Sequence, residues 1–285
     1  MKTPATNSEY QVWRSEQLFN IDFACYTLSQ HHFSKHFHDH YVIEFVLNGA
    51  DDFFCAGKTF TAISNQLVLI NPGEVHTGNT VDRARLKYFS LNPTFRQLEA
   101  VAEHCGLAIP PDFNFQQTVV DNPTLAGKFA SLFKTFLANT SILCKQEKLV
   151  DSISSLLSFS MAKKVSPASI EKHDARVNLL TDYIRQHYMN DICLQQLAAL
   201  VNLNPFHMLR IFKKATGLSP YEYLLVIRVE QARQLLQKGS KVEQAALDTG
   251  FYDSSHFNRM FRKIAGMSPI SYRLSKCQYR TSFAG

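Results

Sequence analysis

Two stretches near the carboxyl end of the chain, FKKATGLSPYEYL (212–224) and FRKIAGMSPISYR (261–273), repeat one pattern at an offset of 49 residues. A second pair, LQQLAALVNL (194–203) and VEQAALDTGF (242–251), lies upstream of them at an offset of 48. Self-similarity at a fixed spacing indicates a duplicated supersecondary unit. Each copy predicts a short helix, a tight turn and a second helix, followed by glycine, Ser-Pro and another helix.

Turn-forming and helix-capping residues stand at matching places in both copies. A residue that tolerates a left-handed backbone is followed by an N-cap at the start of the second helix, and a glycine ends that helix. In the first copy the turn residue is Asn202, the N-cap is Asn204, followed by Pro205, and the final glycine is Gly217. In the second copy the corresponding residues are Gly250, Asp253 and Gly266. Two helices joined by a tight turn are typical of a helix-turn-helix unit, so the sequence predicts two such units.

The second helix of each copy has one apolar and one basic face. The apolar faces, which we expect to be buried, are Met208, Ile211, Phe212 and Ala215, and Phe257, Met260, Phe261 and Ile264. The opposite faces carry Phe206, His207, Arg210, Lys213 and Lys214, and Ser255, His256, Arg259, Arg262 and Lys263. The major groove of DNA admits one helix, in which arginine donates two hydrogen bonds to guanine and other cations pair with phosphates. Solvation alone would explain one such face, whereas two matched faces behind tight turns predict DNA binding.

The segment between the copies, residues 221–237, has the pattern of a long amphipathic helix that is closed by Gly239. Its apolar side chains are expected to belong to the core. As a rigid spacer it would set the separation of the two basic helices, so that both can enter successive major grooves, which lie about 34 Å apart.

Composition limits the classes of protein to which the chain can belong. Its 285 residues suffice for two domains, and 45% hydrophobic with 19% charged residues excludes wholesale disorder and a coiled-coil rod. Residues 174–285 contain 15 Lys+Arg and 8 Asp+Glu, whereas residues 1–173 contain 15 and 16, so the duplicated part is the one suited to a polyanion. No apolar run is long enough to span a bilayer. Six widely spaced cysteines favour reduced thiols in the cytoplasm over a disulfide framework or a zinc site.

The duplicated region resembles the C-terminal domain of the AraC/XylS family of bacterial transcription regulators. The resemblance rests on LQQLA (194–198), LNPFHMLRIFKKATGLSPYEYL (203–224), Arg228, Ala232 and AALDTGFYDSSHFNRMFRKIAGMSPISYR (245–273). It implies recognition helices at 205–215 and 254–264. The DNA contacts that the resemblance and the basic faces imply are Phe206, His207, Arg210, Lys213, Lys214, Ser255, His256, Asn258, Arg259, Arg262 and Lys263.

The first half of the chain predicts a different fold. Residues 20–95 contain short apolar stretches that are separated by turn signals such as Asn48-Gly49 and Asn71-Pro72-Gly73. Many short strands are typical of a small barrel or jelly roll. We expect strands at 41–47, 53–55, 58–62, 66–70 and 86–91. Residues 122–160 have the pattern of two amphipathic helices, whose apolar stripes are expected to pack against the barrel.

Histidines cluster in HHFSKHFHDHY (31–41), where His36, His38 and His40 alternate as on one face of a strand, and His76 follows a later turn. Together with Glu44, Gly49 and residues 71–79, they resemble the cupin-type sensory domain at the front of many AraC-family members. Because a barrel mouth commonly holds a small molecule, the residues expected to line an effector pocket are His38, Glu44, Glu74 and His76. The open alternatives are histidines bonded to backbone groups and a metal site like that of catalytic cupins. We expect no metal and no cofactor.

The predicted fold class is a two-domain protein with an N-terminal cupin-like β-barrel with helices (1–160), a linker (161–174) and a C-terminal all-α domain of two helix-turn-helix units (175–285). We expect a cytoplasmic, non-enzymatic regulator that binds double-stranded DNA under the control of a small-molecule effector. The resemblance implies an activator that forms homodimers through the helices after the barrel and works with RNA polymerase, without a membrane partner. The alternatives are a metal-dependent cupin enzyme with a DNA-binding appendage and a constitutive DNA-binding regulator whose barrel only dimerises.

Overall fold

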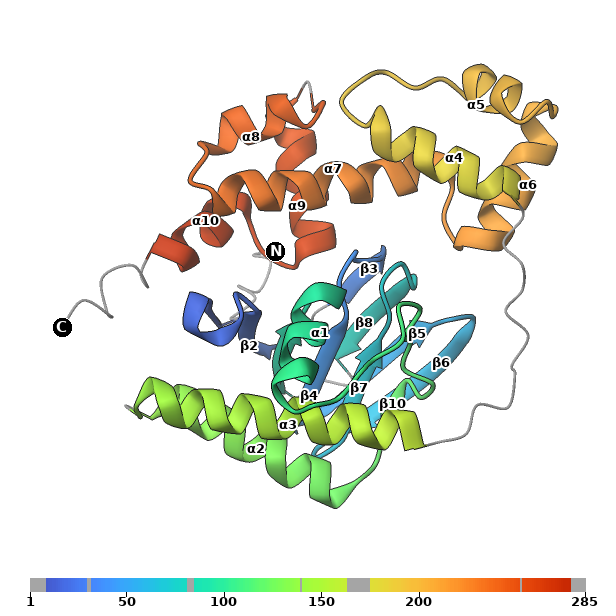
Figure 1. Cartoon of the computed structure of the whole chain (residues 1–285). Coiled ribbons are helices and arrows are strands. Elements are labelled where there is room, and N and C mark those ends of the chain that lie inside the picture. The colour runs from blue at the N-terminus through green and yellow to red at the C-terminus, as the bar shows by residue number, and fades with distance from the viewer. Residues whose placement is uncertain are drawn as a thin grey trace. The chain divides into compact units, whose positions relative to one another are not determined.

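The computed structural model describes residues 9–29, 32–80, 85–138, 140–162, 175–251 and 253–277. Within them the chain forms two compact units, a β-rich one and a helical one (Figure 1). Residues 33–37 and 75–77 belong to the helical unit together with the later helices. This division confirms the fold class expected from the sequence. Most of the expected linker, residues 163–174, lies outside the described residues, so the bounds of the two domains stay predictions.

The first half of the chain contains two β-sheets. Its strands are β1 (Glu9–Trp13), β2 (Asp22–Leu28), β3 (His32–His36), β4 (Val42–Asn48), β5 (Ala50–Cys55), β6 (Lys58–Ile63), β7 (Leu67–Ile70), β8 (His76–Thr80), β9 (Leu86–Asn92) and β10 (Val119–Val120). One sheet has the strand order β1-β2-β9-β4-β7-β10 and the other β3-β8-β5-β6. The five strands expected from the sequence are present as β4, β5, β6, β7 and β9, and β5 begins three residues earlier than expected.

Register and alternation decide which side chains enter the interior between the sheets. Phe23 of β2 stacks on Phe89 of β9, and both rings contact Phe136 of helix α2 (Pro123–Leu137), so this face of the six-stranded sheet is covered by the helix. Glu44 pairs with Ser90 across the β4–β9 ladder. Because neighbouring side chains along a strand point to opposite faces, Glu44 and Tyr88 point away from the helix and into the interior.

The helices of the β-rich unit are the short 3₁₀ helix η1 (Glu16–Leu18), α1 (Phe95–His104), α2 and α3 (Ile142–Ala162). The two helices expected within 122–160 are α2 and α3, which lie side by side (Figure 1). Helix α1 was not predicted. Its start is a capping box in which the Thr94 hydroxyl accepts from Gln97 N and the Gln97 side chain accepts from Thr94 N. Because this box is a local T-x-x-Q pattern, the sequence contained a signal for the helix.

The helical unit contains the two helix-turn-helix units. Its helices are α4 (Ala175–Gln186), α5 (Leu194–Leu200), α6 (Pro205–Thr216), α7 (Pro220–Gln237), α8 (Val242–Asp248), α9 (Ser254–Ala265) and α10 (Pro269–Cys277). The pairs α5–α6 and α8–α9 are the two predicted units, and α7 runs between them as the predicted spacer (Figure 1). Helix α7 contacts α4 and α6 as well as α8, α9 and α10, which makes it the core of this unit. None of the described helices meets the length and apolarity needed to cross a membrane.

Caps explain where α6 and α9 begin and end. The Asn204 side chain accepts from His207 N at 2.8 Å, and the Asp253 carboxylate accepts from the first-turn N–H groups of α9 at 2.9 and 3.1 Å. Gly217 and Gly266 end the two helices in the left-handed conformation, with φ of 73° and 76°. These contacts satisfy backbone groups that a helix end leaves without intrahelical partners.

The predicted apolar faces of α6 and α9 are buried at five of their eight positions, while Ile211 and Met260 are half-buried. Met208, Phe212, Phe257 and Phe261 are each 0% exposed. Ala215 was expected to be buried but is exposed. Its counterpart in the second copy is Ile264, which is 9% exposed. The longer isoleucine side chain reaches the core from the last turn of its helix, whereas the alanine methyl group is too short to do so.

Candidate functional site

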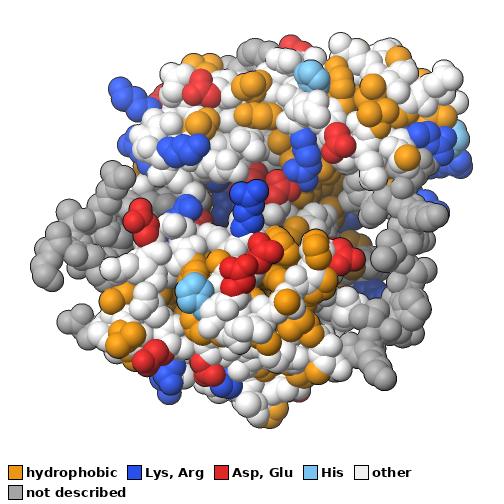
Figure 2. All heavy atoms as spheres, in the orientation of Figure 1, with side chains coloured by type: hydrophobic (Ala, Val, Ile, Leu, Met, Phe, Trp, Pro, Cys, Tyr) orange, Lys and Arg blue, Asp and Glu red, His pale blue; other side chains and the backbone are white. Residues whose placement is uncertain are grey.

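Helices α6 and α9, called here the recognition helices, present matched basic faces to solvent. The exposed cations of α6 are Arg210, Lys213 and Lys214, and those of α9 are Arg259, Arg262 and Lys263. Each cation of α6 has its counterpart 49 residues later in α9. Figure 2 shows Lys and Arg side chains gathered at the edge of the helical unit where Figure 1 places α6. Such a surface is suited to phosphates, and arginine within it is suited to guanine.

The amino-terminal turns of the recognition helices carry the remaining expected contacts. Phe206 is 81% exposed, an unusual state for a large aromatic side chain and one that suits contact with a thymine methyl group. Ser255 is exposed, while His207 and His256 are half-buried. Asn258 is half-buried as well, and its side-chain amide donates to the carbonyl of Ser254 in its own helix at 2.8 Å. These residues therefore lie on the two helices as expected, with Asn258 already engaged in a local hydrogen bond.

A buried arginine joins the two helix-turn-helix units through α7. Arg228 is 7% exposed, and its guanidinium donates to the carbonyls of Tyr188 at 2.7 Å and Asn190 at 3.0 Å, in the segment between α4 and α5. The same guanidinium lies over the ring of Phe251, in the turn of the second unit, at 5.9 Å from the ring centroid. A buried cation needs such partners. Arg228, on the spacer α7, thereby connects the segment that leads into the first helix-turn-helix unit with the turn of the second.

The turn glycine of the second unit is required by this arrangement. Gly250 has a φ of 82°, in the left-handed region. A Cβ atom at this position would lie 2.8 Å from the carbonyl oxygen of Met189 and 3.0 Å from Cζ of Arg228. The matching residue of the first unit, Asn202, is also left-handed, with a φ of 51°. The turn of the second unit therefore needs both the conformation and the small size of glycine.

Three histidines from β3, the turn after it and β8 converge. His36, His38 and His76 each offer a ligand atom, and these atoms all lie within 4.8 Å of one another. The expected alternation of His36, His38 and His40 along one strand is wrong, because β3 ends at His36. Beyond it the chain turns, and the carbonyl of His38 accepts from Gly73 N at 2.7 Å. This turn brings His38 back toward the end of the strand, with the ring of His40 stacked on it at 4.7 Å between centroids.

The two acidic residues expected beside these histidines lie in different surroundings. The Glu74 carboxylate accepts from the backbone and side-chain N–H groups of Asn71 at 2.9 and 3.2 Å, and so closes its own turn. Glu44 points into the barrel interior, where burial, with a contribution from Asp51, raises its pKa to about 8. Burial also raises the pKa of Asp51 to about 7, against the hydrogen bond from Asn79 N. The structure therefore places Glu44 with Asp51 rather than with Glu74.

Comparison with known proteins identifies both parts of the chain. Residues 20–153 match the AraC-like ligand binding domain, and residues 197–275 match a helix-turn-helix domain. The HTH-type transcriptional regulator YbfI of Bacillus subtilis is 30% identical over 226 residues, which cover 79% of this chain and 81% of that protein. The chain belongs to the AraC family of transcriptional regulators. As an AraC-family member it is a DNA-binding transcription regulator with an N-terminal ligand-binding domain.

Other proteins extend the comparison. The HTH-type transcriptional activator RhaS of Klebsiella pneumoniae is 27% identical over 255 residues, covering 86% of this chain and 89% of RhaS. Among solved structures, ToxT from Vibrio cholerae with a bound unsaturated fatty acid has a TM-score of 0.57 at 14% identity, covering 96% of this chain and 97% of ToxT. At that identity the similarity concerns the fold alone, so the ligand of ToxT is not assigned to this AraC-family protein.

Three residues that shape these sites were not singled out from the sequence. His36 was noted in the histidine cluster but was not expected in the pocket. Asp51 lies on the buried face of β5 with Phe53 and Cys55, and this alternation along 51–55 could have placed it inside. Arg228 was noted only within the AraC-family resemblance. Its partners are the backbone carbonyls of Tyr188 and Asn190, about 40 residues away, and no local sequence pattern indicates such contacts.

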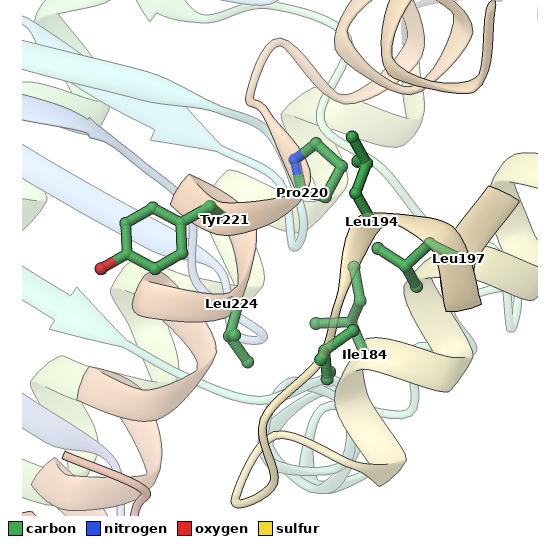
Figure 3. Close-up of a pocket in the computed structure, with 7 residues that line it drawn as sticks. Ile184, Leu194, Leu197, Pro220, Tyr221 and Leu224 are labelled. Atoms are coloured by element: carbon green, nitrogen blue, oxygen red, sulfur yellow. The ribbon is translucent and has the colours of Figure 1, made fainter. Parts of the chain in front are cut away.

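The helical unit also contains a small apolar pocket (Figure 3). Its volume is about 200 Å³. The lining residues are Ile184, Ile192, Leu194, Leu197, Pro220, Tyr221 and Leu224. Sites for drug-sized ligands measure roughly 300–1,000 Å³ and contain placed polar groups. This pocket is smaller and its lining side chains are almost entirely apolar, so it does not suit the effector of an AraC-family regulator.

Proposed function

We propose that the protein is a one-component regulator in which a small-molecule effector binds inside the barrel and the recognition helices bind adjacent major grooves of a promoter. One observation carries the DNA-binding part, namely the matched exposed cations of α6 and α9 on a unit whose two halves are joined by α7 and Arg228. Because α7 and Arg228 restrict the motion of one recognition helix relative to the other, we expect the two helices to bind the same DNA duplex together.

The interior of the barrel supports the effector part of the proposal. Glu44, Asp51 and Tyr88 meet there, and the electrostatic contacts among them raise the pKa of Tyr88 in addition to burial. Asp51 already accepts from Asn79 N at 3.0 Å, and hydroxyl or amine groups of an effector would add hydrogen bonds to these interior polar groups. Of the four residues expected in the pocket, we keep His38, Glu44 and His76 as proposed effector contacts. Glu74 is left out because its carboxylate accepts hydrogen bonds from Asn71 within its own turn. An effector acts by binding one conformation of the protein more tightly than another.

We further propose that the protein activates transcription with RNA polymerase, has no enzymatic activity of its own and forms homodimers through α2 and α3. The similarity to RhaS, which is named an activator, supports the direction of regulation. Leu137 of α2 and Leu143 of α3 support the dimer, because 54% and 61% of these large apolar side chains is exposed. The mass of the full-length protein in solution, measured by light scattering with and without DNA, tests the dimer.

The DNA-binding part is tested with labelled DNA from the region next to the protein's own gene. Footprinting locates the site, and fluorescence anisotropy then measures its affinity. Arg210→Ala and Arg259→Ala should each weaken specific binding by about 1–3 kcal/mol without changing the thermal melt. Lys58→Ala removes an exposed cation of β6 and serves as the matched control. Equal affinity in wild type and both arginine variants would refute the assignment of the recognition helices.

The effector part is tested by thermal melting of the full-length protein with pools of small molecules. A ligand that binds only the folded state at 100 times its dissociation constant adds about 2.7 kcal/mol to the free energy of unfolding. We expect one pool to raise the melting temperature of the wild type and to act less on Glu44→Gln. An equal rise in melting temperature for the wild type and Glu44→Gln would exclude the barrel interior around Glu44 as the effector site.

A further inference from the structure

We propose that the effector is an organic cation, a small molecule whose ammonium group binds between Glu44 and Asp51 inside the barrel. The inference rests on the proposed effector function of the barrel and names the chemical class of molecule that it would take. Glu44 lies on β4 of the six-stranded sheet, and Asp51 lies on the buried face of β5 in the four-stranded sheet. The two carboxyl groups therefore come from different sheets and meet in the interior between them.

The groups that face Glu44 from the neighbouring strands are acidic, aromatic or apolar. Its partner on β7 is Val68, and the titratable groups that act on it or on its neighbours are Asp51 of β5 and Tyr88 of β9. Lys87 of β9 points to the other face of the sheet, where its ammonium group lies over a ring of helix α2. Within the described part of the chain, the charges that act on the two carboxyl groups are those of other acids. A positive charge in this interior has to come from a ligand.

Two tyrosine rings stand beside the carboxyl groups. Tyr88 is 6% exposed and stacks on Tyr26, its partner across the β2–β9 ladder, at 5.0 Å between ring centroids. Among the described residues, the Tyr88 hydroxyl has no hydrogen-bond partner, which is costly for a buried polar group. Glu44 and Tyr26 are only half-buried although they point between the sheets, so a small molecule can reach them. Carboxylates next to tyrosine ring faces are a suitable environment for an ammonium group.

The protonation of the two acids agrees with a cationic ligand. Burial raises the pKa of Glu44 to about 8 and that of Asp51 to about 7. Below about pH 7 both groups are therefore largely protonated without a ligand. An ammonium group placed beside them favours their charged forms, and an amine with an ordinary pKa of about 10 stays charged throughout this range. Binding of the amine should consequently release protons, and its affinity should increase with pH.

Other ligand classes fit this interior less well. A carboxylate or phosphate would be repelled by the two acids. A hard metal ion such as Ca²⁺ takes about six to eight oxygen ligands, whereas the described interior offers two carboxyl groups beside tyrosine and apolar side chains. A neutral polyol would find hydrogen-bond partners but would leave both acids protonated. An organic ammonium ion is the class that uses the charges and the rings together.

Thermal melting of the full-length protein with probes of equal length and different charge tests the proposal. One set consists of putrescine, 1,4-butanediol and succinate, and a second set consists of tyramine, tyrosol and 4-hydroxyphenylacetate. CaCl₂ is tested alongside them. We expect at least one of the two amines to raise the melting temperature and its neutral and acidic counterparts to leave it unchanged. Calorimetry should then show one equivalent of that amine per chain, with an affinity that increases between about pH 6 and pH 8.

Glu44→Gln and Asp51→Asn each remove one carboxylate and keep the shape of the side chain. Each should weaken binding of the amine about tenfold or more, the loss expected for one charge-assisted hydrogen bond. Asp52→Asn is the matched control, because Asp52 lies on the other face of β5, where it accepts from the Thr61 hydroxyl at 2.5 Å. It should bind the amine as the wild type does. All variants are first compared in melts without probe, and if Asp51→Asn is unfolded, Glu44→Gln and its control decide the matter.

The outcomes separate this proposal from the effector function on which it rests. Failure of both amines to stabilise the protein beyond their neutral counterparts, or equal binding of the amine by Glu44→Gln and Asp52→Asn, would overturn the proposal. Stabilisation by a neutral probe, an anionic probe or CaCl₂ that Glu44→Gln abolishes would keep the barrel as a ligand site and refute the organic cation. If neither these probes nor the pools of small molecules act on the wild type, the effector function fails as well.

Discussion

Replacing Gly250 with alanine tests whether Arg228 joins the two helix-turn-helix units as described. The added Cβ would lie 3.0 Å from Cζ of Arg228 and 2.8 Å from the carbonyl oxygen of Met189. Because such contacts are too short, the guanidinium or the backbone must move. A displaced guanidinium loses at least one of its hydrogen bonds to the carbonyls of Tyr188 and Asn190.

The magnitude follows from two contributions. A side chain in the left-handed conformation costs about 1–2 kcal/mol, and losing one hydrogen bond of a charged group costs about 1.5–3 kcal/mol. Together they predict a loss of about 2.5–5 kcal/mol in the free energy of unfolding. Gly239→Ala separates the two contributions, because Gly239 has a φ of 98° and a Cβ there would meet nothing within 4 Å. The control should lose only about 1–2 kcal/mol.

Equilibrium unfolding in urea, followed by the helical circular dichroism signal, measures both losses on the full-length protein. We expect Gly250→Ala to lose about 2 kcal/mol more than Gly239→Ala, which is the contribution of one charged hydrogen bond. Specific DNA affinity, measured where both variants are folded, should fall for Gly250→Ala alone, since only this variant loosens the joint between the recognition helices. Equal losses of stability in the two variants would refute the reasoning.

Three other predictions concern pH, capping and salt. Burial raises the pKa of Glu44 from 4.5 to about 8, so the folded state keeps a proton that the unfolded state releases, and stability should fall as pH rises through this range. Glu44→Gln should reduce that fall in thermal melts at pH 5 to 8, and superimposable profiles would contradict the buried position. Asn204→Ala removes the hydrogen bond to His207 N and should lower the free energy of unfolding by about 1 kcal/mol in urea titrations; no change would mean that the cap is not formed in solution. DNA affinity should decrease about 10³- to 10⁵-fold between 50 and 200 mM salt if 6–10 phosphates are contacted, and an affinity insensitive to salt would exclude the basic faces as the contact surface.

The helical unit was predictable because its boundaries are encoded locally. The sequence predicted α6 and α9 to within one residue, since an N-cap and a glycine stand at the ends of each helix. The duplication then supplied a check, as each inference from one copy could be compared with the other. Local signals could not predict the contacts of Arg228. Its hydrogen-bond partners lie about 40 residues before it in the chain, and the ring that it covers is that of Phe251, after it.

The β-rich unit was predictable only in outline. Short apolar stretches between turn signals identified β4 and β9, but the alternating histidines His36, His38 and His40 were interpreted as one face of a continuous strand. The strand ends at His36 because the backbone beyond it bonds outside the sheet, where Gly73 N donates to the carbonyl of His38. Such bonds join residues far apart in the chain, and therefore leave no periodic signal. The same limit applies to Glu74, whose role in its turn depends on Asn71 rather than on the histidines.

The duplication is incomplete, and this has a consequence for the promoter. The amino-terminal turn of α6 carries Phe206 and His207, whereas the corresponding turn of α9 carries Ser255 and His256. One chain thus carries two recognition helices with different amino-terminal side chains, in a fixed order at the two ends of α7. The stretch of bases that suits it has a left end and a right end, and inverting that stretch would not restore the same fit. Each bound molecule must consequently point one way along the genome.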